Sequence, residues 1–113
     1  MINIAHFDDV ELYLTDTARL LRPSGFEVVR TAKSLREAKI VIPTLLSLGV
    51  VLALIDGDIG GKDIVELMTL ECPSIITVGF ATDPVPGAMH YIERTTLPDE
   101  FVSLVKLYTA RTT

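Results

Sequence analysis

The chain has 113 residues, 49% of them hydrophobic, which suits a single core and predicts one domain over residues 1–113. Its only cysteine, Cys72, excludes an intrachain disulfide and a zinc site built from cysteine pairs, and favours a reducing, cytoplasmic environment. A formal net charge of −5 at pH 7 disfavours a nucleic-acid-binding surface, so no DNA-binding domain is expected.

The N-terminal part predicts two strands joined by a helix. The apolar segment "INIAHF" (Ile2–Phe7) reads as a strand, and "MINIAHFDD" has no features of a secretory signal. Apolar residues at helical spacing follow over 10–21, where Asp8 or Asp9 is suited to cap the helix. A turn at "RPSG" precedes a second strand over 26–31. No apolar run is long enough to span a bilayer, so no membrane association is expected.

The middle of the chain predicts a broken helix and then a central strand. Ser34 and Glu37 have the spacing of a capping box, and helical periodicity continues to Gly49. Pro43 lies inside this stretch and is expected to kink or split the helix. The continuous apolar run "VVLALI" (Val50–Ile55) is typical of a parallel strand that is covered on both faces.

The C-terminal part continues the alternation of helices and strands. The remaining predicted elements are a helix over 62–70, strands over 74–79 and His90–Glu93, and a helix that begins at Pro98. Only the six residues "ATDPVP" separate Phe80 from Gly87, so a helix between the last two strands should be shortened or absent. The alternation predicts a doubly wound α/β sandwich with right-handed crossovers.

Acidic side chains follow two of the predicted strands. Asp8 and Asp9 come after the first strand, and Asp56 and Asp58 come after the third, in "LALIDGDIGGKD". If these strands are neighbours, their carboxyl ends meet at one edge of the sheet and the carboxylates share a crevice. Carboxylates held together repel one another and favour a divalent cation, and oxygen ligands alone favour Mg²⁺.

Three segments in chain order resemble the receiver domains of response regulators, the CheY-like family. They are "FDDVELYLTDTARLL", "LALIDGDIGGKDIVELM" with the D-x-x-x-x-G-x-D spacing, and "GAMHYIERTTLPDEF". The resemblance implies a flavodoxin-like sheet of five parallel strands in the order 2-1-3-4-5. It also implies that Asp56 accepts a phosphoryl group and that Asp9 and Asp56 bind Mg²⁺ directly, together with the Asp58 backbone carbonyl and, through water, Asp8. It also implies that Arg94, at the family's lysine position, contacts the phosphoryl group.

The sequence departs from the family pattern around the last two strands. The family's strand-four hydroxyl falls on Gly79, whereas its partner in the switch, a ring on strand five, is present as Tyr91. Thr77 or Thr82 is a candidate to replace the missing hydroxyl. Thr95 stands where the family has a proline, and a non-proline cis bond costs about 2.5–4 kcal/mol, so this loop is expected to be rebuilt.

Several of these residues also have purely structural interpretations. Asp8 and Asp9 can serve only as caps, and Asp58 can be turn chemistry. For Tyr91, a packing role is favoured over a role in the switch, because the partner hydroxyl of the switch is missing. Other structural alternatives are a core position for His6, an ion pair of Arg94 with Asp58 or Glu93, and either core or interface packing for the apolar segment "IVIPTLLSL", which leaves a homodimer possible.

Three functions follow from the sequence. The first is a stand-alone, non-enzymatic receiver in phosphorelay signalling, whose partners are a histidine kinase or phosphotransfer protein and an unknown downstream protein. The second is a pseudo-receiver that keeps the fold and binds a protein partner without phosphotransfer. The third is a Toprim-like Mg²⁺ nucleic-acid enzyme, because "LIDGDIGG" also resembles the D-x-D-x-x-G loop of that family.

Overall fold

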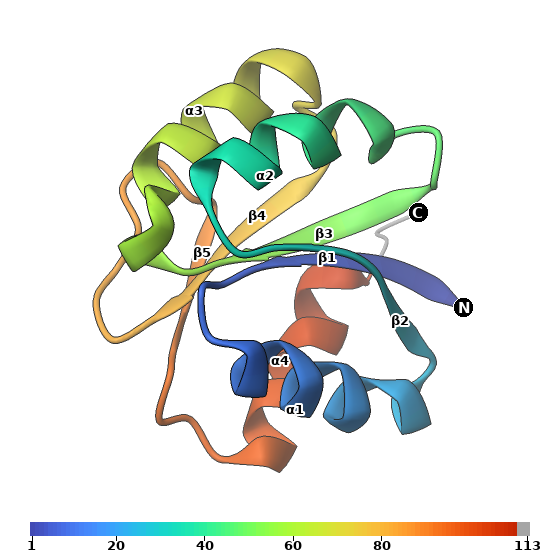
Figure 1. Ribbon diagram of the computed structural model, residues 1–113. Helices are drawn as coiled ribbons and strands as arrows, with labels where there is room; N and C mark the ends of the chain where they lie inside the picture. Colours follow the sequence, from blue (N-terminus) through green and yellow to red (C-terminus); the bar gives the residue numbers. More distant parts are fainter. Residues whose placement is uncertain (111–113) are drawn as a thin grey trace.

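The computed structural model describes residues 1–110, which form a three-layer α/β sandwich (Figure 1). A single sheet of five parallel strands has the order β2-β1-β3-β4-β5, as predicted. The strands are β1 (Ile2–Phe7), β2 (Phe26–Ala32), β3 (Val50–Ile55), β4 (Ile76–Ala81) and β5 (His90–Glu93). The helices are α1 (Glu11–Leu21), α2 (Leu35–Val41), α3 (Gly61–Glu71) and α4 (Pro98–Thr109).

The helices cover both faces of the sheet. Figure 1 shows α2 and α3 on one face and α1 and α4 on the other. Alternate residues of β3 feed the two resulting cores: Ala53 and Ile55 pack on the α2/α3 side, whereas Leu52 and Leu54 pack on the α1/α4 side. An apolar residue at every position of β3 is therefore explained by burial on both faces.

Most predicted boundaries hold, with two corrections. β4 runs from Ile76 to Ala81, two residues later than predicted, because its register with β3 pairs Gly79 with Ile55. The predicted cap of α1 is wrong, since the N-cap residue is Val10 and no side chain caps it. Asp8 instead accepts a hydrogen bond from the Val10 N–H (2.9 Å), just before the helix begins.

Pro43 breaks the second helix as predicted, but residues 45–49 form turns, so the expected continuation of the helix to Gly49 is wrong. α2 ends at Val41, and a short 3₁₀ helix over Ile42–Thr44 carries the proline. The Ser34 hydroxyl caps α2 by accepting from the Glu37 N–H at 3.1 Å.

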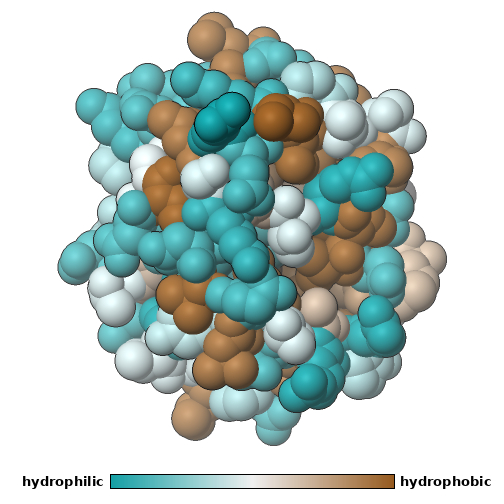
Figure 2. All heavy atoms as spheres, in the orientation of Figure 1, coloured by the Kyte–Doolittle hydropathy of each residue, from teal (hydrophilic) through white to brown (hydrophobic). Residues whose placement is uncertain are grey.

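Between β4 and β5 the chain forms turns and no helix, which confirms the predicted loss of that element. Figure 2 shows hydrophilic residues over much of the visible face, with hydrophobic residues scattered among them. Of the apolar segment "IVIPTLLSL", Ile42 and Leu45 are buried in the core, whereas Ile40 and Leu46 are exposed. None of the helices within residues 1–110 combines the length and apolar character needed to cross a bilayer.

Candidate functional site

The carboxylates that follow β1 and β3 meet at one edge of the sheet. Backbone hydrogen bonds fix the two loops, from the Asp8 N–H to Ala32 O (3.0 Å) and from the Asp56 N–H to Phe7 O (2.9 Å). Oxygens of Asp8, Asp9 and Asp56 all lie within 4.8 Å of one another. Asp8 is fully buried and Asp56 is 5% exposed, whereas Asp9 is open to solvent. Two charged groups buried this deeply need a compensating cation.

Arg94 provides positive charge to this cluster from the end of β5. Its Nη2 donates hydrogen bonds to Asp56 Oδ1 (3.1 Å) and to the Phe80 carbonyl (3.0 Å). The same nitrogen lies 2.7 Å from Asp8 Oδ2, where the two groups form an ion pair without hydrogen-bond geometry. The structural alternative in which Arg94 pairs with Asp58 or Glu93 is therefore wrong.

Two aromatic rings hold the Arg94 guanidinium in place. Its central carbon lies 4.1 Å from the centre of the Tyr13 ring and 4.9 Å from that of Phe80. Cation–π contacts of this kind contribute about 0.5–2 kcal/mol each. Arg94 thus has both electrostatic and aromatic partners, which fix its position more firmly than a surface ion pair could.

The loop after β3 is shaped by close backbone contacts. The Asp58 N–H donates to Asp56 Oδ2 (3.3 Å), so each oxygen of Asp56 has a donor. A side chain at Gly61 would place its Cβ 2.6 Å from the Asp56 carbonyl oxygen, which explains the glycine in the D-x-x-x-x-G spacing. Asp58 lines the cavity beside the acids but is not one of the three clustered carboxylates.

The buried titratable groups respond to this environment in opposite ways. Burial, reinforced by the neighbouring Asp8 charge, raises the pKa of Asp56, and Arg94 opposes the shift. Burial and the Arg94 charge lower the pKa of His6 from 6.5 to about 3, so its ring is neutral at physiological pH. His6 Nε2 lies 3.7 Å from Asp8 Oδ2, beyond hydrogen-bond distance, and the residue occupies a core position as one sequence interpretation held.

A cavity of about 220 Å³ opens above the acids, and its lining includes Thr82 and Arg94. The donor set fits Mg²⁺, because it consists of carboxylate oxygens and because Asp8 Oδ2 is buried without a hydrogen-bond donor. A cation that binds both Asp8 and Asp56 competes with Arg94 for the same oxygens.

Gly79 faces the loop that follows β4. A Cβ at this position would lie 2.9 Å from Val85 Cγ2 and 3.2 Å from the Val85 backbone nitrogen. Val85 is 5% exposed, and it also contacts the space left free by Gly57 and Gly61. The Val85 side chain thus occupies the space beside three glycines. A serine or threonine at Gly79 would not fit unless the Val85 loop moved.

The two candidate replacements for the strand-four hydroxyl lie in different places. The Thr77 hydroxyl accepts from the Met89 N–H (3.1 Å), which commits it to the β4–β5 loop, away from the acids. Thr82, in contrast, lines the acidic cavity. The Tyr91 hydroxyl lies within donating distance of the Ala81 and Thr82 carbonyls, at 3.0 and 2.9 Å, so it holds the start of this loop.

Comparison with solved structures identifies the fold. A response regulator receiver domain (CheY-like) from Methanospirillum hungatei JF-1 superposes with a TM-score of 0.82 at 21% identity, over 96% of this chain and 94% of that one. A response regulator from Thermotoga maritima gives 0.82 at 18% identity over 98% and 99% of the two chains. A signal receiver domain of a histidine kinase from Clostridium thermocellum gives 0.80 at 12% identity over 96% and 98%.

These likenesses show that the chain has the receiver-domain fold, as its sequence resemblance implied. No family model and no curated protein matches the chain.

Sequence reasoning missed two contributors to the site. Tyr13 reads as an ordinary exposed residue of α1, and nothing in the sequence shows that its ring covers Arg94. Val85 lies in the segment "ATDPVP", where its packing against three distant glycines depends on the folded loop.

Proposed function

We propose that this chain is a receiver-type signalling domain whose Asp56 accepts a phosphoryl group in the presence of Mg²⁺. One observation carries the proposal: in a receiver fold, oxygens of Asp8, Asp9 and Asp56 lie within 4.8 Å of one another beside an open cavity. The donor is a histidine kinase, a phosphotransfer protein or a small acyl phosphate.

In the transfer step, a carboxylate oxygen of Asp56 attacks the phosphorus atom. The new O–P bond forms as the donor's bond to phosphorus breaks, and the donor leaves with that electron pair. Mg²⁺, when held by Asp8, Asp9 and Asp56, neutralises charge on the phosphoryl oxygens. Asp58 contributes its backbone carbonyl to the metal site in this proposal, and its side chain lies outside the clustered carboxylates.

Arg94 has two tasks in this proposal. Without a cation, it compensates the buried charges of Asp8 and Asp56. During transfer, its positive charge lies beside the same cavity and stabilises the phosphoryl oxygens. Arginine suits this position because its charge persists at every physiological pH.

The experiment is incubation with acetyl phosphate and Mg²⁺ followed by intact-mass measurement. We expect the mass to increase by one phosphoryl group, and the increase to need Mg²⁺ and to be absent in Asp56→Asn. Asp63→Asn is the matched control, because Asp63 is an exposed acid at the start of α3, outside the cluster. An unmodified parent protein, or equal labelling of Asp56→Asn, would contradict the proposal.

A second candidate is a protein-interaction module without phosphotransfer. It is favoured by the Arg94 nitrogen that already neutralises Asp8 and Asp56, and by Val85, which fills the space beside Gly79. The same mass measurement separates the two functions, because this module remains unmodified. The Toprim alternative gains no such support, since Asp56 clusters with Asp8 and Asp9 and not with Asp58 among the described residues.

A further inference from the structure

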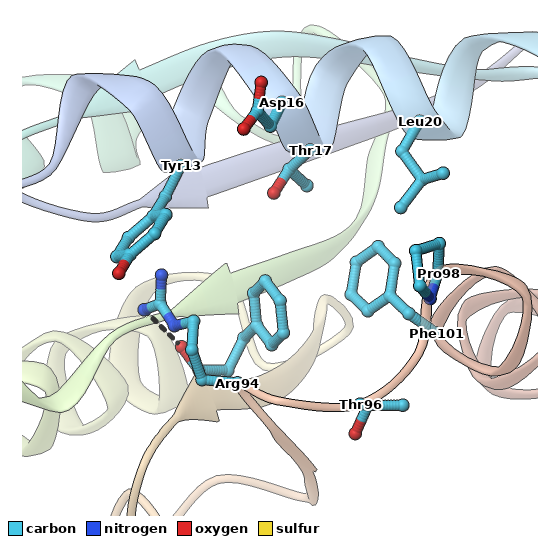
Figure 3. Close-up of a pocket in the computed structure, with 9 residues that line it drawn as sticks. Tyr13, Asp16, Thr17, Leu20, Arg94, Thr96, Pro98 and Phe101 are labelled. Carbon is cyan, nitrogen blue, oxygen red and sulfur yellow. Dashed lines mark hydrogen bonds between the residues drawn. The ribbon is translucent and has the colours of Figure 1, made fainter.

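A second cavity lies between α1 and α4, on the other side of Arg94 from the acids. Its volume is about 330 Å³, near the lower end of ligand-binding pockets. Figure 3 shows Tyr13, Thr17 and Leu20 on the α1 side, and Pro98 and Phe101 opposite them. Most of these side chains are apolar, so the walls favour an apolar molecule.

Thr17 is the exception among the buried residues of this wall. It is only 6% exposed, and its hydroxyl has no hydrogen-bond partner within residues 1–110. Two threonines in other helices, the exposed Thr69 of α3 and the buried Thr109 of α4, each donate to the carbonyl four residues earlier at 2.8 Å. Figure 3 shows the Thr17 oxygen directed toward the cavity. This hydroxyl is therefore available to a bound molecule.

Arg94 and two stacked rings define the polarity and shape of the cavity. Phe80 and Phe101 stack on each other with their ring centres 4.7 Å apart, so together they form an apolar aromatic wall of the cavity. The Arg94 guanidinium closes one end, but Asp8 and Asp56 already share its charge. Asp16 also lines the cavity, so three carboxylates near this end disfavour an anion.

We propose that this cavity binds a small neutral molecule with one aromatic ring and a hydrogen-bond acceptor that faces the Thr17 hydroxyl. The Phe80 and Phe101 rings provide the apolar contact, and the acceptor takes a hydrogen bond from the Thr17 hydroxyl. This binding does not depend on phosphoryl transfer, so it can be tested on the unmodified protein.

Benzamide is a suitable probe, since it has one ring and one amide carbonyl. We titrate it into the ¹⁵N-labelled chain and follow amide chemical shifts. Saturable shifts in the millimolar range are expected at Tyr13, Thr17, Thr96 and Phe101. Thr17→Val keeps the side-chain shape and should weaken binding about threefold to tenfold, the value of one hydrogen bond. Thr15→Val, at an exposed position of the same helix, should leave the affinity unchanged.

A variant and two further probes make the test decisive. Leu20→Trp fills the cavity and should abolish the shifts, while its own spectrum shows whether the domain is folded. Toluene lacks the acceptor and should bind more weakly than benzamide. Absent or non-saturable shifts, shifts centred elsewhere, unchanged affinity in Thr17→Val, or tighter binding of benzylamine than of benzamide would each overturn the proposal.

Discussion

At the carboxyl edge of the sheet, the loops after β1 and β3 are acidic and border an open cavity, whereas the loop after β4 is anchored by the buried side chain of Val85. The first region places Asp8 and Asp56 beside Arg94, with one Asp8 oxygen lacking a hydrogen bond. The second packs Val85 against Gly79. One edge of the sheet thus has two different halves. The loops after β1 and β3 form an acidic half, and the loop after β4 forms a half that is held in place by packing. The residues proposed to bind Mg²⁺ and the phosphoryl group are therefore not the residues that hold the loop after β4.

The largest effect is expected from Arg94→Gln. Removing this cation leaves Asp8 and Asp56 facing each other without compensation, which should lower the free energy of unfolding by about 3 kcal/mol without Mg²⁺. Urea unfolding with and without Mg²⁺ measures the loss, and added Mg²⁺ should restore part of it. The variant should also bind Mg²⁺ more tightly than the parent, because Arg94 no longer competes for the carboxylate oxygens.

Arg94→Lys is the control for this prediction. It keeps the positive charge without the planar guanidinium, so it should lose less stability than the glutamine variant. An Arg94→Gln protein that equals the parent in metal-free urea unfolding would show that the acidic half does not need this cation.

A smaller effect is expected in the packed half. Gly79→Ala forces a Cβ against Val85 and should cost about 1–3 kcal/mol of unfolding free energy. Val85→Ala removes the closest atom of that contact, so the double variant should be about 1 kcal/mol more stable than the sum of the single losses predicts. A double-mutant cycle in urea tests this coupling. Strict additivity would mean that the loop yields freely and that this half is not rigid.

The effect of His6 is the smallest of the three near neutral pH, and it grows as the pH falls. Unfolded His6 takes up a proton below 6.5, whereas the folded residue resists protonation down to about 3, so stability should fall as pH decreases between these values. Asp56 acts in the opposite direction, because its raised pKa favours proton uptake by the folded state. His6→Leu should therefore flatten the acid side of the stability curve, measured by urea unfolding at successive pH values.

The control is His90→Gln, because His90 is exposed and stacks on Tyr108 at the surface. This variant should keep the pH dependence of the parent. If the His6→Leu curve runs parallel to the parent curve, the buried imidazole does not contribute to acid sensitivity.

The sequence predicted the fold well because local patterns determine it. The apolar run over Val50–Ile55 and the alternation of elements were sufficient for the fold class, the family resemblance implied the strand order, and Pro43 marked the break in the second helix. The acids were found because Asp8 and Asp56 each end a strand, and parallel strands bring such ends together.

The contacts of the site depended on distant residues and were harder to predict. The bridge from Arg94 to Asp8 and Asp56 spans residues far apart in the chain, and a surface pair with a neighbour such as Glu93 was an equal alternative from sequence. The β4 boundary was placed too early because "SIITVG" has strand character throughout, whereas register with β3 sets the true start at Ile76.

Beryllofluoride, a mimic of the phosphoryl group, tests the contrast between the two halves most directly. With Mg²⁺ and beryllofluoride added to the ¹⁵N-labelled protein, we expect amide shifts at residues 8–10, 56–61, 82 and 94, which border the cavity, and little change over 83–89. Strong shifts across the Val85 loop would contradict the rigidity of that half. A spectrum that does not change anywhere would contradict the proposal that Asp56 accepts a phosphoryl group.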